Sequence, residues 1–182
     1  MSSKYKFLDQ SRPYFVSFAI IEWVDVFVRP NYVEILLDSL RYCQKNKGLV
    51  LYAWCVMPSH IHLIMGTSCA PMQDILRDFK SFTSRKLREE INSNIQESRK
   101  EWMLPIFLKA DKQNSNSLNW QIWQNSKHPI ELEGNQMIDQ KMNYLHENPV
   151  KSGFVEHPED WLYSSARDYA GKKGLLDIVI SD

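Results

Sequence analysis

Two histidines separated by one residue are the first candidates for chemistry in this chain. His60 and His62 lie in the segment MPSHIHLIM, which otherwise has the pattern of a buried strand. Because alternate residues of a strand share a face, both imidazoles should point one way, while Ile61, Leu63 and Met65 point the other way. Two imidazoles on neighbouring positions of one face can bind a single metal ion. A pair of ordinary surface histidines gives the same spacing, so the H-x-H pattern alone leaves both interpretations open.

A tyrosine and an asparagine much later in the chain form a second candidate pair. Tyr144 and Asn148, in the segment NYLHENPVKSG, are four residues apart, so on a helix they share one side, one turn apart. The amide oxygen of Asn148 could complete a metal site made by two histidines, and the phenol of Tyr144 could attack a phosphate held by that metal. In the structural alternative, Tyr144 packs at the boundary of the core and Asn148 ends a helix before Pro149.

The first half of the chain predicts the elements that position the histidines. In order, these are a strand over 14–23 that should be central, a helix over 29–48, a hairpin of strands over 49–57 and 60–66, and a helix over 71–92. This order supplies most of the ferredoxin-like (RRM-like) β-α-β-β-α-β unit, an α+β fold whose antiparallel sheet has both helices on one face. The other face is predicted to be free, and both imidazoles should lie on it.

The second half predicts an insertion, a closing strand and a third helix. Residues 93–118 have the composition of an insertion with a short helix around Trp102 and a polar loop. Either 119–124 or 129–132 can supply the closing strand, and a helix over 135–148 carries Tyr144. The helix has an apolar stripe of Ile138, Met142 and Leu145. The aromatic tail, 155–171, should wrap the domain, and 175–180 is a candidate for a short final strand.

Composition limits the classes of protein that the chain can represent. Its 182 residues, 43% hydrophobic, predict a single domain over 1–182. With no apolar segment long enough to span a membrane and no signal-peptide pattern at the start, we expect a cytoplasmic protein with no membrane partner. Cys43, Cys55 and Cys69 form no C-x-x-C pair and are predicted to be small buried residues rather than zinc ligands or disulfides.

Charge and aromatic content bear on a nucleic-acid partner. The 22 basic and 22 acidic residues give zero formal net charge, which argues against a protein that coats DNA non-specifically. A local basic face on the second predicted helix could still hold a DNA backbone, although such a face is more often merely solvated; its residues are Arg77, Lys80, Arg85, Lys86 and Arg88. Most of the many aromatic residues should be core, but exposed ones could stack on unpaired bases.

Taken together, these motifs resemble a known family. The pattern His60-Ile61-His62 on a central strand, followed by Tyr144 and Asn148-Pro149 on a later helix, resembles the single-tyrosine transposases of the HUH superfamily, insertion-sequence-200-like family. The continuation NPVKSGFV with PEDWLYSS resembles the branch called REP-associated tyrosine transposases. The resemblance covers most of residues 14–170.

The resemblance implies an activity and its residues. It implies the ferredoxin-like fold with the tyrosine on a C-terminal helix, His60 and His62 as metal ligands, Asn148 as the third ligand and Tyr144 as the nucleophile. The implied cofactor is Mg²⁺ or Mn²⁺. The implied substrate is single-stranded DNA carrying a hairpin, which the enzyme nicks and joins through a 5′-phosphotyrosine intermediate and a free 3′-hydroxyl. The resemblance also favours a homodimer, because family members include dimers that place tyrosine and histidines from different subunits in one site, although monomers also occur.

Two other functions stay open on the sequence alone. One is a catalytically silent, domesticated protein that binds hairpin nucleic acid, and the other is a metal-dependent hydrolase in which water attacks and Tyr144 is structural. His128 and His146 have no predicted role, and His146, two positions from Tyr144, is predicted to be solvent-exposed.

Overall fold

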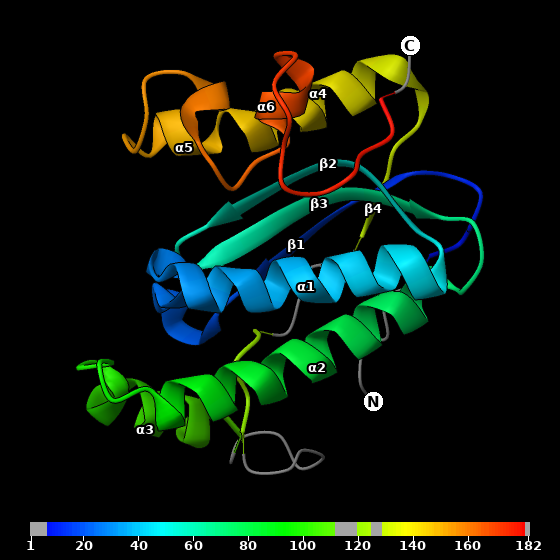
Figure 1. Cartoon of the computed structure of the whole chain (residues 1–182). Helices are drawn as coiled ribbons and strands as arrows, with labels where there is room; N and C mark the ends of the chain where they lie inside the picture. The colour runs from blue at the N-terminus through cyan, green and yellow to red at the C-terminus, as the bar shows by residue number, and fades with distance from the viewer. Residues whose placement is uncertain (1–6, 112–119, 125–128, 181–182) are drawn as a thin grey trace.

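The computed structural model describes residues 7–111, 120–124 and 129–180. A four-stranded antiparallel sheet lies between two layers (Figure 1). One layer holds α1 (Pro30–Lys47) and α2 (Met72–Ser93), and the other holds α4 (Gly134–His146) with the C-terminal segment. The predicted mixed α+β class is therefore confirmed.

The strand order places the histidine strand next to the first strand. The strands are β1 (Tyr14–Ala19), β2 (Leu49–Met57), β3 (His60–Thr67) and β4 (Ile130–Glu131), in the order β2-β3-β1-β4. β1 and β3 are thus the two central strands. The closing strand comes from 129–132. In the other candidate segment, Trp123 makes only an isolated bridge to Ile20, and residue 119 lies outside the described residues.

β1 ends earlier than predicted, at Ala19 rather than at residue 23. Glu22 and Trp23 have φ values of 51° and 57°, in the left-handed region, so the backbone cannot continue a ladder. Two short 3-10 turns follow instead, η1 (Ile21–Trp23) and η2 (Val26–Val28). The chain therefore turns away at the end of the sheet where β3 begins, because Ala19 pairs with His60.

α1 and the β2–β3 hairpin form as predicted. α1 ends at Gly48, whose φ of 73° is left-handed and which approaches Cys69 so closely that a Cβ would lie 2.7 Å from the Cβ of that residue. Glycine is thus required both by the left-handed backbone conformation and by the lack of room for a Cβ beside Cys69. Only Pro58 and Ser59 separate β2 from β3, so the two histidines begin the returning strand immediately after the turn.

The larger core lies between the sheet and the layer of α1 and α2. Ile61, Leu63 and Met65 of β3 belong to it, as their alternation predicts. α2 presents Ile75, Leu76, Phe79 and Leu87 to this core, all of them buried. Phe82 of the same helix is 39% exposed. Its position three residues after Phe79 carries it to the edge of the buried stripe.

The predicted insertion contains the expected short helix, α3 (Lys100–Asp111), while its loop at 112–118 lies outside the described residues. The buried carboxylate of Glu97 fixes the start of this segment. It accepts hydrogen bonds from Arg29 Nε at 2.7 Å, from Arg99 Nε at 2.9 Å and from the Tyr32 hydroxyl at 3.1 Å. Arg99 also contacts Asp25, so one network joins the insertion to α1 and to the turn after β1.

The second face of the sheet is covered, which corrects the prediction that it is free. A smaller core forms there from β-sheet residues and from Leu145 of α4, with Ile138 and Met142 packed against it. The predicted apolar stripe of the third helix is thus the surface that contacts the sheet. Amphipathic spacing predicted this stripe, but it could not show which face of the sheet would receive it.

The tail also packs on this side of the sheet. After α4 come α5 (Asn148–Lys151), η3 (Pro158–Asp160) and α6 (Ala166–Tyr169). Val56 of β2 donates its backbone N–H to the carbonyl of Tyr163, and the Trp161 indole donates to the carbonyl of Val56. The predicted strand at 175–180 does not form. Within it, Val179 donates one backbone hydrogen bond to the carbonyl of Leu51.

Cys43 and Cys55 are buried, as predicted, but Cys69 is exposed, because it lies in the turn between β3 and α2. Among the residues that the structure describes, none of the helices has the length and apolar character needed to cross a membrane.

Candidate active site

His60 and His62 lie side by side at the start of β3. Their ring centroids are 4.8 Å apart, with the planes at 79°. His62 pairs with Ser17 of β1 and Cys55 of β2, so neighbouring strands flank it on both sides. The two histidines therefore share one face of the sheet, as predicted. That face is covered at His62, which is only 4% exposed, whereas His60 is half-buried.

Burial keeps both imidazoles neutral. Desolvation lowers the pKa of His60 below its usual value of 6.5. Desolvation first, and then repulsion from His60 when that imidazole is protonated, lower the pKa of His62 to about 3. The ring of Phe15, from β1, stacks on His62 with centroids 5.5 Å apart and supplies part of this apolar environment. A neutral imidazole keeps a nitrogen lone pair, which is what metal binding requires.

Tyr144 lies in the last turn of α4, where its ring packs against the rings of His62 and Phe15. Its ring centroid is 5.4 Å from that of His62 and 6.0 Å from that of Phe15. The residue is 46% exposed, so a macromolecular substrate can reach it. Lys141, one turn earlier on α4, places its ammonium 5.9 Å from the centroid of the Tyr144 ring. A cation therefore lies beside the half-exposed phenol.

Asn148 contacts His62 directly. Its amide Nδ2 lies 3.1 Å from His62 Nε2, which accepts the hydrogen bond if the imidazole proton is on Nδ1. α4 ends at His146, and Asn148 is the first residue of α5, so Tyr144 and Asn148 lie on two consecutive helices rather than on one. Pro149 is accommodated at the start of the new helix, where its missing N–H costs nothing.

His60, His62 and Asn148 offer donor atoms of kinds that divalent cations accept, namely imidazole nitrogen and amide oxygen. His62 Nε2 faces the Asn148 amide, and turning that amide over would bring its oxygen to the same place. His62 Nδ1 is buried without a hydrogen-bond partner. The described residues contain no group of three or more His, Cys, Asp or Glu side chains that could hold a metal, so the candidate set is two imidazoles and an amide. All three are neutral, which leaves the charge of a bound cation available to a phosphate.

His146 is buried, not exposed as predicted, at 8% exposure. Its Nε2 lies 2.8 Å from the Ser165 hydroxyl, and burial lowers its pKa to about 4. The tail folds back over α4 and brings Ser165 there, a long-range contact that helical periodicity cannot reveal. His146 thus ties the tail to the helix that carries Tyr144. His128 lies outside the described residues.

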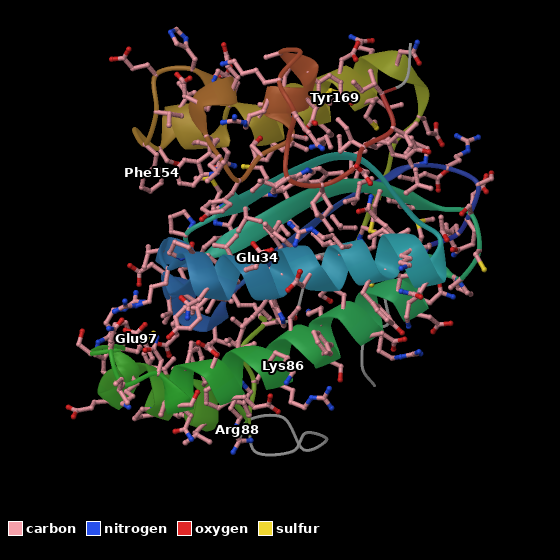
Figure 2. All side chains as sticks on the ribbon, viewed as in Figure 1. Glu34, Lys86, Arg88, Glu97, Phe154 and Tyr169 are labelled. Carbon is pink, nitrogen blue, oxygen red and sulfur yellow. The ribbon has the colours of Figure 1, made fainter. Side chains whose placement is uncertain are left out.

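The predicted basic face of α2 is on the other side of the sheet from these residues. Figure 2 shows Lys86 and Arg88 on α2, in the layer away from the one that contains Tyr169. Lys86 pairs with Glu89, and the Arg88 guanidinium lies 5.4 Å from the Trp120 ring centroid. The structure therefore does not bring this face to the histidines and the tyrosine.

The other three basic residues of α2 also have local partners. Arg77 forms ion pairs with neighbouring aspartates of its own helix. Arg85 lies over the ring of Phe82, at 5.7 Å from its centroid. Lys80 is largely desolvated, which lowers its pKa to about 8, and its ammonium contacts the backbone carbonyl of Gln124 at 3.3 Å.

Three residues at the site were not singled out from the sequence. Lys141 precedes Tyr144 by three positions and therefore shares its side of the helix, a signal that the spacing contains. Phe15 reaches His62 only through the strand pairing. Trp23 has its ring centroid 5.4 Å from that of His60, and nothing in the sequence pattern indicates the left-handed turn that places it there.

The comparisons with known proteins agree with the predicted family resemblance. Residues 24–107 match the sequence model of the family described as Transposase IS200 like. This match includes His60 and His62 but ends before Tyr144, so it covers just under half of the chain. No curated protein sequence matches the chain.

Solved structures extend the similarity to the whole fold. A structure of the REP-associated tyrosine transposase bound to a REP hairpin is similar with a TM-score of 0.66 at 17% identity, covering 100% of this chain and 94% of that chain. A candidate transposase from Deinococcus radiodurans R1 is similar with a TM-score of 0.43 at 21% identity, covering 75% of this chain and 88% of that chain. The fold is therefore that of a REP-associated tyrosine transposase, and the predicted resemblance to IS200-like transposases is confirmed.

Proposed function

We propose that this protein is a single-tyrosine DNA transposase that nicks and joins single-stranded DNA at a hairpin, with Tyr144 as the nucleophile. The observation that carries the proposal is the meeting of His62, Tyr144 and Asn148. His62 is more than eighty residues from Tyr144 and Asn148 in sequence, yet both contact its imidazole. The IS200-like sequence match also supports the reaction class. This support is independent of Tyr144 and Asn148, because the match ends before both residues.

The covalent step transfers one phosphoryl linkage. The phenolic oxygen of Tyr144 forms a bond to phosphorus, and the bond from phosphorus to the 3′-oxygen of the preceding nucleotide breaks. The phenol loses its proton to solvent, and the departing 3′-oxygen gains one. The products are a 5′-phosphotyrosine and a free 3′-hydroxyl, which can attack in the reverse direction to reseal a strand. The linkage is conserved, so no ATP is needed.

The side chains around Tyr144 have separate roles in this proposal. Phe15 and His62 hold the phenol in place through ring contacts, while its exposure leaves it accessible to DNA. Lys141 attracts the phosphate and favours the negative charge that develops on the phenolic oxygen. His60, His62 and Asn148 would hold Mg²⁺ or Mn²⁺, which would supply Lewis-acid polarisation of the phosphate.

A hairpin in single-stranded DNA is the proposed substrate. The solved structure with the same fold holds a REP hairpin. The zero net charge of the chain agrees with recognition of a defined local structure better than with general DNA binding. No second subunit is required to bring the four proposed residues together, since one chain supplies them all.

The test is a covalent-adduct assay with Mn²⁺ and a library of DNA hairpins that carry randomised single-stranded flanks. DNA labelled at the 3′ end should become attached to the protein and survive denaturation. DNA labelled at the 5′ end should be released as a shorter strand whose 3′-hydroxyl a polymerase can extend. Tyr144→Phe should abolish the adduct, and chelation of the metal should do the same.

The matched control is Tyr42→Phe, because Tyr42 is a comparably exposed tyrosine on α1, in the other layer. This variant should form the adduct as the unmodified protein does. Cleavage that survives Tyr144→Phe would contradict the proposal and indicate attack by water. Hairpin binding with no cleavage under any condition would indicate a catalytically silent binding protein.

A further inference from the structure

Trp23 is an exposed aromatic residue beside the candidate active site. It is 60% exposed, although tryptophan is on average a well-buried residue. Its ring meets that of His60 edge-on, with centroids 5.4 Å apart and planes at 77°. Figure 1 shows the turn that contains it at the end of the sheet where β3 begins and α5 lies. The proposed catalytic role of the neighbouring residues does not use this indole.

The backbone that presents Trp23 is unusual. Glu22 and Trp23 are consecutive residues in the left-handed region, which disfavours any residue with a Cβ and which glycine would adopt freely. Hydrogen bonds hold the turn in this shape, from the N–H of Trp23 to the carbonyl of Ile20 at 2.9 Å and from the N–H of Ile21 to the carbonyl of Ile122 at 2.8 Å. Strained conformations that the surroundings enforce are concentrated at functional sites.

Trp23 also completes a row of rings. From His60 the row continues to His62, 4.8 Å away, and then to Tyr144, a further 5.4 Å away. Trp23 therefore contacts one histidine of the pair, and the proposed nucleophile contacts the other. A strand whose phosphate reaches Tyr144 and the histidines would carry a neighbouring nucleotide past Trp23.

We propose that Trp23 is a stacking platform for an unpaired base next to the phosphate that reacts, an inference that rests on the proposed function. Exposed aromatic rings bind single-stranded DNA by stacking, and every base offers a face for this contact. The adjacent Glu22 is exposed and carries a carboxylate, which disfavours a phosphate at this position. The expected contact is therefore with the uncharged base rather than with the backbone.

Binding is measured without catalysis to separate this role from the chemistry. The background is Tyr144→Phe, metal is chelated, and the probe is a hairpin with single-stranded flanks selected for binding from the randomised library. Trp23→Ala should raise the dissociation constant about 5- to 150-fold, the range that loss of one stacked base implies. Trp23→Phe should restore part of the affinity, because a smaller ring can still stack. Tyr42→Ala, which removes another exposed aromatic side chain, should leave the affinity unchanged.

A scan of abasic positions through the flanks then identifies the contact. One position next to the cleavage point should weaken binding to the protein that retains Trp23, and the same lesion should have no effect on Trp23→Ala. If Trp23 only packs against His60, affinity without metal will be the same in Trp23→Ala, and the lesion will affect both proteins equally. That result overturns the inference while the adduct assay still supports the transposase. A change of oligomeric state in Trp23→Ala would also overturn it, in favour of a protein contact.

The two proposals fail in different ways. If the unmodified protein selects no hairpin and forms no adduct, the proposed function fails and the base-stacking role fails with it. If hairpins are selected and the adduct forms, but Trp23→Ala binds with unchanged affinity, only the stacking role is wrong. Circular dichroism of Trp23→Ala should match that of the unmodified protein, because an exposed side chain is removed and the backbone strain is the same for alanine.

Discussion

At the scale of single residues, the site combines neutral metal-ligand candidates with one nearby cation. Burial depresses the pKa of His60 and His62, so their ring nitrogens are available at neutral pH. Asn148 adds a neutral amide. Lys141 brings a positive charge to the site, and its ammonium lies 5.3 Å from the centroid of the Phe15 ring. The approach of a DNA phosphate to Tyr144 should therefore depend on it.

Replacement of Lys141 tests this dependence. We expect Lys141→Gln to slow formation of the tyrosine adduct about tenfold, which corresponds to about 1.4 kcal/mol of lost electrostatic stabilisation. Lys141→Arg should keep most of the rate, because the charge is retained. The measurement is the single-turnover rate with a selected hairpin at saturating Mn²⁺. An unchanged rate in Lys141→Gln would show that the ammonium does not act on the reacting phosphate.

At the scale of elements, the Glu97 network joins the segment before α3 to the start of α1 and to the turn that follows Trp23. Arg29 immediately precedes α1, Arg99 immediately precedes α3, and Asp25 lies in the turn that follows Trp23. The Glu97 side chain is fully buried, and the hydrogen bond from Arg99 is the largest of the effects that lower its pKa, to about 2. Its negative charge is therefore part of the folded structure over the whole neutral and mildly acidic range.

The pH dependence of stability follows from this shift. The pKa of Glu97 is lower in the folded chain than in the unfolded chain, so its contribution is fully present above about pH 4.5 and is lost as the pH falls towards 2. We expect Glu97→Gln to lower the free energy of unfolding by about 3 kcal/mol at neutral pH, since two guanidinium groups lose their buried partner. The difference from the unmodified protein should shrink as the pH is lowered.

Urea unfolding at several pH values measures this difference. Glu89→Gln is the control, because Glu89 pairs with Lys86 on the exposed side of α2 and its removal should leave the free energy of unfolding essentially unchanged. A gap between Glu97→Gln and the unmodified protein that stays constant from neutral pH down to acid would contradict an ionised Glu97 as the source of the stabilisation.

The elements also show which features of the site the sequence could predict. The shared face of His60 and His62 follows from strand alternation, and the closeness of Tyr144 to Asn148 follows from their spacing, even though α4 ends between them. Both are local patterns. The covering of the second face of the sheet, the burial of His146 under Ser165 and the placing of Trp23 by a left-handed turn depend on contacts between distant segments. Periodicity contains no information about these contacts.

At the scale of the whole molecule, the site lies where the sheet meets the layer formed by α4 and the tail. β3 supplies the histidines, and the chain that follows α4 supplies Asn148. Trp161 binds the tail to β2, and His146 binds the tail to α4. The proposed nucleophile and metal ligands therefore come from one chain. This arrangement bears directly on whether the active protein needs a dimer in which tyrosine and histidines come from different subunits.

A mixing experiment distinguishes the two arrangements. When Tyr144→Phe is produced together with a second chain carrying His60→Ala and His62→Ala, neither chain has a complete site, so we expect no adduct. Restoration of the adduct would show that the tyrosine of one subunit acts with the histidines of the other. As a control, each variant is produced together with the unmodified chain, which should still form adduct in proportion to its amount. Because Tyr144 and Asn148 already contact His62 within one chain, exchange between subunits would require α4 and α5 to leave the sheet of their own chain and to pack on the sheet of the partner.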